Sequence, residues 1–126
     1  LICTKKDPKK VYFIMEYFKN GDLFNYLNQF KFFNEDTAKF IMIQVYHALN
    51  FLHSKNIIYR DLKPENIMIS DDGFIRLIDF GLSKQLKDGD ETVGDICGTN
   101  EYIPPEVIQK INYLYFLLVG IWYFII

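Results

Sequence analysis

The sequence predicts an α+β fold, because a short apolar strand, a long amphipathic helix and two short strands joined by a turn follow one another along the chain. Half of the residues are apolar and 17% are aromatic, which indicates a folded rather than a disordered chain. The net charge of −2 provides no overall positive field for nucleic acid, so we expect no nucleic-acid partner. The length suits one hydrophobic core, and no repeat or Pro/Ser-rich linker divides the chain.

The first half of the chain predicts one strand and two helices. Residues 11–17, VYFIMEY, form an apolar run that Lys-Asn-Gly follows, which predicts a buried strand and then a bend. Asp22 can cap a short helix that extends to about residue 29. Asn34 can cap a longer helix over residues 34–53, because two acidic residues follow it and apolar residues recur at helical spacing. These apolar residues are Ala38, Ile41, Val45, Ala48, Leu49 and Leu52.

The second half predicts short strands and then a long loop. Residues 57–59 suit a very short strand. Residues 67–69 and 74–78 flank the turn Ser-Asp-Asp-Gly, whose Gly73 can adopt positive φ, so the two runs should pair antiparallel. Residues 79–105 contain many charges and no sustained apolar period, which predicts a loop that is either functional or disordered.

The cysteine and histidine residues indicate neither a disulfide framework nor a metal site. Cys3 and Cys97 lie far apart and match no metal-ligand spacing, so we expect free thiols in a reducing compartment and a cytoplasmic location. His47 and His53 also lack partners at metal-ligand spacing, so both are interpreted as structural. The chain opens without Met or a signal peptide, and we therefore expect it to begin inside a longer gene product.

Two motifs in the middle of the chain carry the chemistry. Residues 59–66, YRDLKPEN, place Asp61, Lys63 and Asn66 close together on a turn that Pro64 makes rigid. The tripeptide Asp79-Phe80-Gly81 follows at a short distance along the chain. Five fixed residue types occur together by chance at roughly 3 × 10⁻⁷ per starting position, which argues against coincidence.

These motifs resemble the catalytic loop, H-R-D-L-x-x-x-N, and the metal loop, D-F-G, of the protein kinase family. The resemblance implies a partial protein kinase-like fold, mainly the helical C-lobe with short β-hairpins and the hinge strand. Residues 1–21 would be the end of the N-lobe with the hinge, 22–110 the C-lobe catalytic core, and 111–126 an apolar tail. The family's glycine-rich loop and strand lysine would precede residue 1, so we expect a fragment of a kinase.

The resemblance implies ATP-dependent phosphorylation of Ser or Thr in protein substrates, with ATP and Mg²⁺ as cofactors. By the same resemblance, Asp61 would orient the substrate hydroxyl and accept its proton, and Lys63 would neutralise the γ-phosphate. Asn66 and Asp79 would hold magnesium. Glu65 and Asp22 could attract an arginine of the substrate, which would favour basic residues near the phosphorylated side chain. The alternative to an active enzyme is an inactive kinase-like fragment, either a pseudokinase binding module or an incomplete gene model.

The run VYFIMEYFKNGDLF resembles the family's fifth strand, hinge and following helix. Main-chain groups of Glu16 and Phe18 would then bind the adenine edge, and Asp22 would bind the ribose. Met68 would pack under the adenine ring, and Met15 would be the gatekeeper to the pocket behind it. Alternatively, the two methionines only fill the core.

Two sequence features resemble the AGC group of Ser/Thr kinases, which includes cyclic-nucleotide-dependent, ribosomal S6 and Akt-like kinases. Tyr59 replaces the usual His of the catalytic loop, and residues 97–102 carry the pattern C-G-T-x-E-Y. Lys63 and Thr99 would favour Ser/Thr over Tyr substrates, and Thr99 would bond near Asp61 and Lys63.

A departure from the group concerns regulation. The position of the activating phosphothreonine, four residues before Thr99, is occupied by Asp95. A carboxylate carries less charge than a phosphate, but Asp95 could pair with Arg60 without an upstream kinase. Alternatively, Asp95 is a solvated loop residue and Thr92 is the phosphosite.

The tail, residues 111–126, is almost entirely apolar and lacks the family's D-x-W-S-x-G pattern. As a helix it would span about 24 Å, less than a bilayer core of about 30 Å. Three interpretations remain: a divergent core helix, a mistranslated intron or frameshift, and a membrane anchor.

Overall fold

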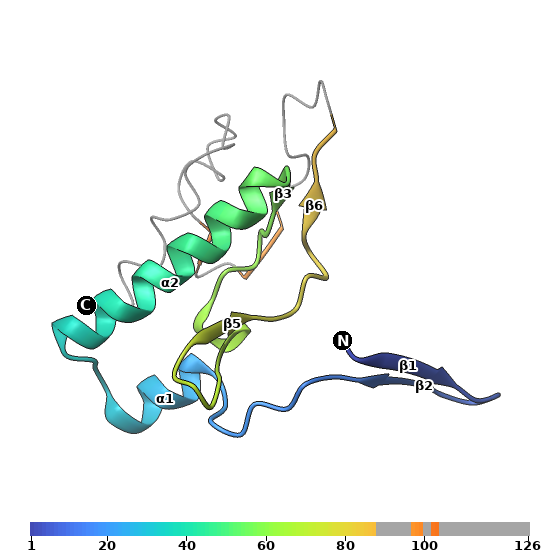
Figure 1. Cartoon of the computed structure of the whole chain (residues 1–126), viewed down its shortest axis with the longest axis horizontal. Helices are drawn as coiled ribbons and strands as arrows, with labels where there is room; N and C mark the ends of the chain where they lie inside the picture. The colour runs from blue at the N-terminus through green and yellow to red at the C-terminus, as the bar shows by residue number, and fades with distance from the viewer. Residues whose placement is uncertain (88–96, 100–101, 104–126) are drawn as a thin grey trace.

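The computed structural model describes residues 1–87, 97–99 and 102–103. Its elements are β1 (Cys3–Lys6), β2 (Val11–Ile14), α1 (Leu23–Phe30), α2 (Glu35–Ser54), β3 (Ile57–Ile58), the 3₁₀ turn η1 (Pro64–Asn66), β4 (Ile67–Ile69), β5 (Ile75–Leu77) and β6 (Lys84–Gln85). The strands form three antiparallel pairs, β1 with β2, β3 with β6, and β4 with β5. Figure 1 shows α2 alongside the β3–β6 pair, while the β1–β2 hairpin extends away from the other elements.

Both predicted helices form, and both begin at the predicted caps. The Asp22 carboxylate accepts a hydrogen bond of 2.7 Å from the main-chain N–H of Asn25 at the start of α1. The Asn34 side chain accepts one of 2.8 Å from the main-chain N–H of Thr37 at the start of α2. Each cap pairs a donor that the helix itself leaves without a partner, which explains why the chain enters its helices at these residues.

The core lies between the buried face of α2 and the elements around the Tyr59–Asn66 loop. Five of the six residues predicted on this face are buried, and Ala48 is only half-buried. The core comprises Leu23, Ala38, Ile41, Val45, Leu49, Leu52, Tyr59, Leu62, Ile67 and Ile75. The side-chain oxygen of Gln44 on α2 accepts a hydrogen bond of 3.0 Å from the main-chain N–H of Ile75, which attaches β5 to the helix.

The β4–β5 hairpin pairs in the predicted antiparallel sense, with Ile67 opposite Leu77 and Ile69 opposite Ile75. Its turn contains Gly73 at φ 80°, the positive value that the sequence predicts. The strand β4 has the predicted bounds, whereas β5 is shorter than its apolar run and covers only Ile75–Leu77. The hairpin leads directly into Asp79, so it fixes where that residue lies.

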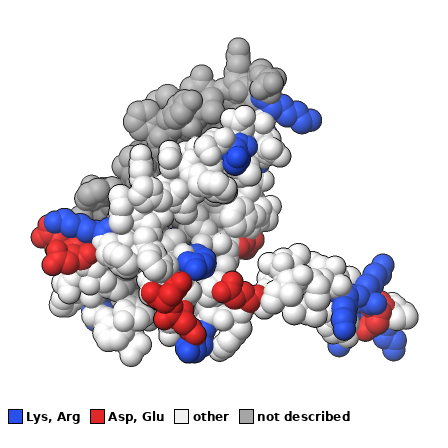
Figure 2. Space-filling model, in the orientation of Figure 1, with Lys and Arg blue, Asp and Glu red and all other residues white. Residues whose placement is uncertain are grey.

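The structure corrects the prediction of a buried strand at residues 11–17. The strand β2 ends at Ile14, and all four of its residues are exposed, including Phe13 at 63%. Its partner β1 was not predicted, because the sequence CTKK has no strand-like apolar pattern. The carboxylate of Asp7 closes the turn by accepting hydrogen bonds from the main-chain N–H groups of Lys9 and Lys10, at 2.7 and 2.9 Å. Figure 2 shows lysine side chains gathered at the far end of this hairpin.

The segment predicted as one long loop, residues 79–105, contains the strand β6. Its two residues pair with β3, with Ile58 opposite Lys84. The main-chain N–H of Leu86 also donates to the carbonyl of Asn56 at 2.7 Å. A strand of two polar residues has no apolar period, so only its pairing reveals it.

Other sequence predictions have mixed outcomes. Both cysteines are free, as predicted. Among the described residues, no helix has the length and apolar character needed to cross a membrane. The tail, residues 111–126, lies outside the described part of the chain, so its three interpretations remain predictions.

Replacing the α2 cap tests the packing of this fold. We expect Asn34→Ala in the full-length protein to lower the free energy of unfolding by about 1 kcal/mol, because the Thr37 N–H loses its partner. The control Asn50→Ala changes an exposed position within the same helix and should be neutral or slightly stabilising. Urea denaturation of both variants measures the difference, and equal effects would contradict the assigned start of α2.

Candidate active site

The loop from Tyr59 to Asn66 connects β3 to β4 and is largely buried, which is unusual for a connection. The exposed fractions of Tyr59, Asp61 and Asn66 are 0%, 7% and 6%. Arg60 adopts φ 65°, a left-handed value that is uncommon outside glycine. Such backbone strain persists only where the surroundings hold it, and it concentrates at functional sites.

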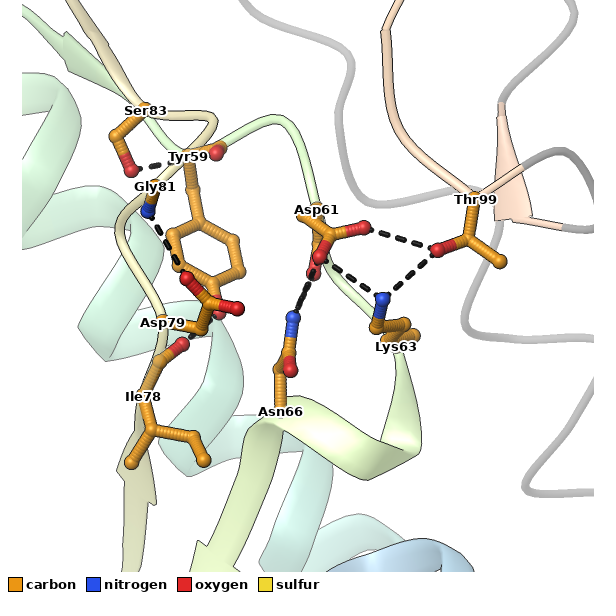
Figure 3. A network of polar contacts seen from close by, with 9 residues as sticks. All are labelled: Tyr59, Asp61, Lys63, Asn66, Ile78, Asp79, Gly81, Ser83 and Thr99. Carbon is orange, nitrogen blue, oxygen red and sulfur yellow. Dashed lines mark hydrogen bonds and ion pairs between the residues drawn. The ribbon is translucent and has the colours of Figure 1, made fainter.

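The carboxylate of Asp61 is the centre of a polar network (Figure 3). Its Oδ2 accepts hydrogen bonds from Nδ2 of Asn66 at 2.8 Å and from Nζ of Lys63 at 2.9 Å. Its Oδ1 accepts one from Oγ1 of Thr99 at 3.0 Å, and this hydroxyl in turn accepts one from Nζ of Lys63 at 2.9 Å. Nδ2 of Asn66 also donates to the main-chain carbonyl of Asp61 at 2.9 Å. The structure therefore brings together four residues that the sequence places in one site.

These contacts decide the charge state of the pair. Burial alone would raise the pKa of Asp61, but hydrogen bonds from Lys63, Asn66 and Thr99 outweigh burial and lower it. The pKa of Lys63 is raised, chiefly by its hydrogen bond to Asp61. Both groups are therefore ionised at neutral pH.

Asp79 follows β5 and adopts φ 57°, a second left-handed residue at the site. The main-chain N–H of Gly81 donates to its Oδ1 at 3.1 Å, which orients the carboxylate. The ring of Phe80 packs edge-on against Tyr59, with centroids 5.2 Å apart. The Tyr59 hydroxyl donates to the carbonyl of Ile78, so it connects the two loops directly.

Tyr59 was expected only as a departure from the usual His and a feature of the AGC group, and its role in connecting the two loops was not predicted. Burial, and then the nearby charges of Asp61 and Asp79, raise the pKa of this phenol above its ordinary value. It therefore remains a neutral hydrogen-bond donor at physiological pH. The signal available in the sequence was a polar aromatic residue directly beside the Arg-Asp pair.

Two further contacts hold the segment after Asp79 against the loop, and sequence reasoning missed both. Nε of Arg60 donates to the carbonyl of Leu82 at 2.7 Å. The hydroxyl of Ser83 donates to the carbonyl of Tyr59 at 3.3 Å. Together with the β3–β6 pair, they fix the position of Asp79 from its C-terminal side.

The predicted nucleotide contacts lie in two parts of the chain, the connection between β2 and α1 and the strand β4. Asp22 and Met68 form an isolated antiparallel bridge, which places these two predicted nucleotide contacts side by side. Both carboxylate oxygens of Asp22 accept hydrogen bonds from Asn25, so this residue also has a structural role as a helix cap. Glu16 is exposed and Phe18 half-buried in the connection between β2 and α1. Met15 is 62% exposed, so it does not fill the core of the described residues.

The predicted magnesium ligands have suitable chemistry. Asn66 and Asp79 carry oxygen donors, which Mg²⁺ prefers. Within the described residues, no group of three or more His, Cys, Asp or Glu side chains could hold a metal ion. The assignment of Mg²⁺ to Asn66 and Asp79 therefore stays a prediction.

The structure describes two of the predicted regulatory residues and not the others. Arg60 and Thr99 lie at the site, as reported above. Asp95 and Thr92 lie outside the described residues, so the pairing of Asp95 with Arg60 remains a prediction.

Comparison with known proteins decides the family. The sequence pattern of the protein kinase domain matches residues 1–122. The chain belongs to the protein kinase family. The fold described above is therefore part of a protein kinase domain, with two helices and small antiparallel sheets.

Individual relatives of this kinase chain are Ser/Thr kinases of the AGC group, as predicted. The chain is 44% identical to the serine/threonine-protein kinase sgk-1 of Caenorhabditis elegans over 108 aligned residues. The alignment covers 86% of the chain and 23% of that protein. It is 46% identical to Sgk2 of Mus musculus, covering 84% of the chain and 29% of that protein. It is 47% identical to the cAMP-dependent protein kinase catalytic subunit PRKX of Homo sapiens, in an alignment that covers 87% of the chain and 30% of that protein. The chain thus spans under a third of the length of these relatives.

The Asp61–Asn66 contact predicts a pH-dependent stability. We expect Asn66→Ala to cost about 1–3 kcal/mol at pH 7, because two buried acceptors of Asp61 lose a donor. The folded-state pKa of Asp61 is lowered from 3.8, so this stabilisation is present above pH 3.8 and is lost as pH falls through the folded value. The cost measured by urea denaturation should therefore shrink below pH 3.8.

Asn20→Ala is the matched control, because its Nδ2 donates to the neutral carbonyl of Ser70 at 3.2 Å. Its cost should not depend on pH in the same range. A pH-independent cost for Asn66→Ala as well would show that the bond to the Asp61 carboxylate contributes nothing to stability.

Proposed function

We propose that the protein that carries this chain transfers the γ-phosphoryl group of ATP to Ser or Thr side chains of protein substrates. The observation that carries this proposal is the buried, ionised carboxylate of Asp61, which hydrogen bonds from Asn66, Lys63 and Thr99 hold in one orientation. The named relatives are Ser/Thr kinases, which supports the same reaction.

Asp61 would receive the substrate hydroxyl. Its lowered pKa makes it a weak base at neutral pH, so it would orient the hydroxyl and accept its proton only as the bond to phosphorus forms. Phosphoryl transfer proceeds through a loose transition state that needs little prior deprotonation, so positioning is the main requirement. A carboxylate held by three donors meets that requirement.

Lys63 would neutralise charge on the transferred phosphoryl group. Its side chain is 21% exposed, so its ammonium group is accessible while it stays paired with Asp61. Thr99 contacts both groups at once, which supports its proposed role in selecting Ser and Thr substrates.

Mg²⁺, when bound with ATP, would neutralise the phosphate oxygens, and Asn66 and Asp79 are the residues that would hold it. The N–H of Gly81 keeps the Asp79 carboxylate oriented for that task. For the nucleotide we propose main-chain contacts from Glu16 and Phe18 to adenine. Asp22 and Met68, which lie side by side, would contact the ribose and the ring.

By the resemblance to protein kinases, residues 1–21 would be the end of the N-lobe with the hinge, and residues 22–110 would be the C-lobe core.

A protein substrate with basic residues near its Ser or Thr fits this site. Oε2 of Glu65 is buried and has no hydrogen-bond partner among the described residues, which favours a cationic group beside it. Together with the free cysteines, this reaction suits a cytoplasmic location.

Removing the central carboxylate tests the proposal. We expect Asp61→Ala in the full-length protein to lower kcat about 10²- to 10⁴-fold, because the hydroxyl loses both its orientation and its proton acceptor. The KM for ATP should change little, since Asp61 makes no proposed contact with the nucleotide. The measurement is Mg-ATP-dependent phosphorylation of a Ser peptide with basic flanking residues.

Asp71→Ala is the control, because it removes an exposed carboxylate that pairs with Lys19 on the surface. This variant should keep full activity. If the wild-type protein transfers no phosphate to any Ser or Thr peptide but still binds a protein partner, the inactive, kinase-like binding module is the correct function.

A further inference from the structure

We propose that Gly98 is a positioning residue for this site: because it has no side chain, Thr99 can reach Asp61 and Lys63. The inference rests on the proposed function for its effect on catalysis, and on the geometry alone for its effect on Asp61. Sequence reasoning used Gly98 only as part of the C-G-T-x-E-Y pattern.

The first observation is a close approach between two segments that lie far apart in the sequence. A Cβ atom on Gly98 would lie 2.8 Å from the main-chain carbonyl oxygen of Arg60, and Cβ atoms essentially never come within 3.0 Å of such an atom. Gly98 also adopts φ 118°, which favours glycine. Any other residue would push residues 98–99 and the catalytic loop apart.

The second observation is that Arg60 cannot move away without disturbing the site. Its backbone already adopts a left-handed conformation, and its Nε donates to the carbonyl of Leu82 at 2.7 Å. Its neighbours in the chain are the fully buried Tyr59 and the buried Asp61. The displacement would therefore fall on residues 98 and 99.

The third observation is that Thr99 has little tolerance for displacement. Its hydroxyl lies 3.0 Å from Oδ1 of Asp61 and 2.9 Å from Nζ of Lys63. A shift of about half an ångström would take both contacts to the limit of a hydrogen bond. The absence of a side chain at Gly98 is therefore what allows both bonds of Thr99.

The experiment compares Gly98→Ala with Gly73→Ala in the full-length protein. Gly73 also has positive φ, at 80°, but a Cβ there would meet nothing within 4 Å. The control therefore carries the backbone strain without the collision. We expect Gly98→Ala to lower kcat about 10- to 100-fold, and Gly73→Ala to leave it within about twofold.

A double-mutant cycle with Thr99→Ala tests whether Gly98 acts through Thr99. If it does, the variant with both substitutions loses no more activity than Thr99→Ala alone. Additive losses would mean that Gly98 acts by another route and would overturn the proposal.

The third measurement does not depend on activity. The hydroxyl of Thr99 donates to Oδ1 of Asp61, so the loss of this bond changes the surroundings of the carboxyl group. The ¹³C chemical shift of the Asp61 carboxyl, measured by NMR at pH 7, should change equally in Gly98→Ala and Thr99→Ala relative to the wild type, and should not change in Gly73→Ala.

These readouts separate the two proposals. An inactive wild-type protein in which Gly98→Ala still changes the ¹³C shift of the Asp61 carboxyl as Thr99→Ala does would refute the proposed function and support the positioning role. An active enzyme in which Gly98→Ala leaves kcat and the ¹³C shift of the Asp61 carboxyl unchanged would refute the positioning role alone.

Discussion

The constraint on which this structure depends is the burial of a negative charge at Asp61. A buried carboxylate is costly unless donors replace the water that it loses. Here the donors are Asn66 and Lys63 from the same loop and Thr99 from a segment 38 residues further along the chain. The carboxylate can stay charged only if these two segments are held together. The hydrogen-bonding requirement of one side chain therefore constrains the positions of both segments.

Two kinds of contact hold the loop in place, apolar packing on α2 and hydrogen bonds to the segment around Asp79. The helix α2 presents an apolar face, and the core that packs on this face includes Tyr59, the first residue of the loop. The hydroxyl of Tyr59 then connects to Ile78, and Arg60 connects to Leu82, so two consecutive residues hold both sides of Asp79. Arg60 and Asp79, which both have left-handed backbone conformations, lie within these connections, where the surroundings compensate for their strain. The loop thus contains both residues with structural roles and residues with proposed catalytic roles.

How far the sequence predicts this fold depends on the range of the interaction involved. The caps at Asp22 and Asn34, the period of α2 and the turn at Gly73 are local features, and the elements they predict are present. The strands β1 and β6 were missed because each is defined by a partner rather than by its own residues. The apolar run at Val11–Ile14 predicted burial, yet the described part of the chain provides nothing that covers it. Periodicity identifies the face of an element that can be buried, but not the surface that buries it.

The site shows the same division. The motif identified Asp61, Lys63, Asn66 and Asp79 because their spacing resembles a family pattern. The approach of Gly98 to Arg60, and the connection from Tyr59 to Ile78, depend on which segments become neighbours. No local pattern encodes such proximity, so these contacts had to be found in the structure.

The contacts of Asp61 also make its two oxygens inequivalent. Each oxygen of a carboxylate has two lone pairs. Among the described residues, Oδ2 accepts from both Asn66 and Lys63, whereas Oδ1 accepts from Thr99 alone. In the proposed reaction the substrate hydroxyl would therefore meet Oδ1, the oxygen with a lone pair to spare. A chemically symmetric carboxylate thus has one oxygen that is available to accept the substrate hydroxyl. Because Asn66 and Lys63 occupy the other oxygen, the substrate must approach from the side of Oδ1.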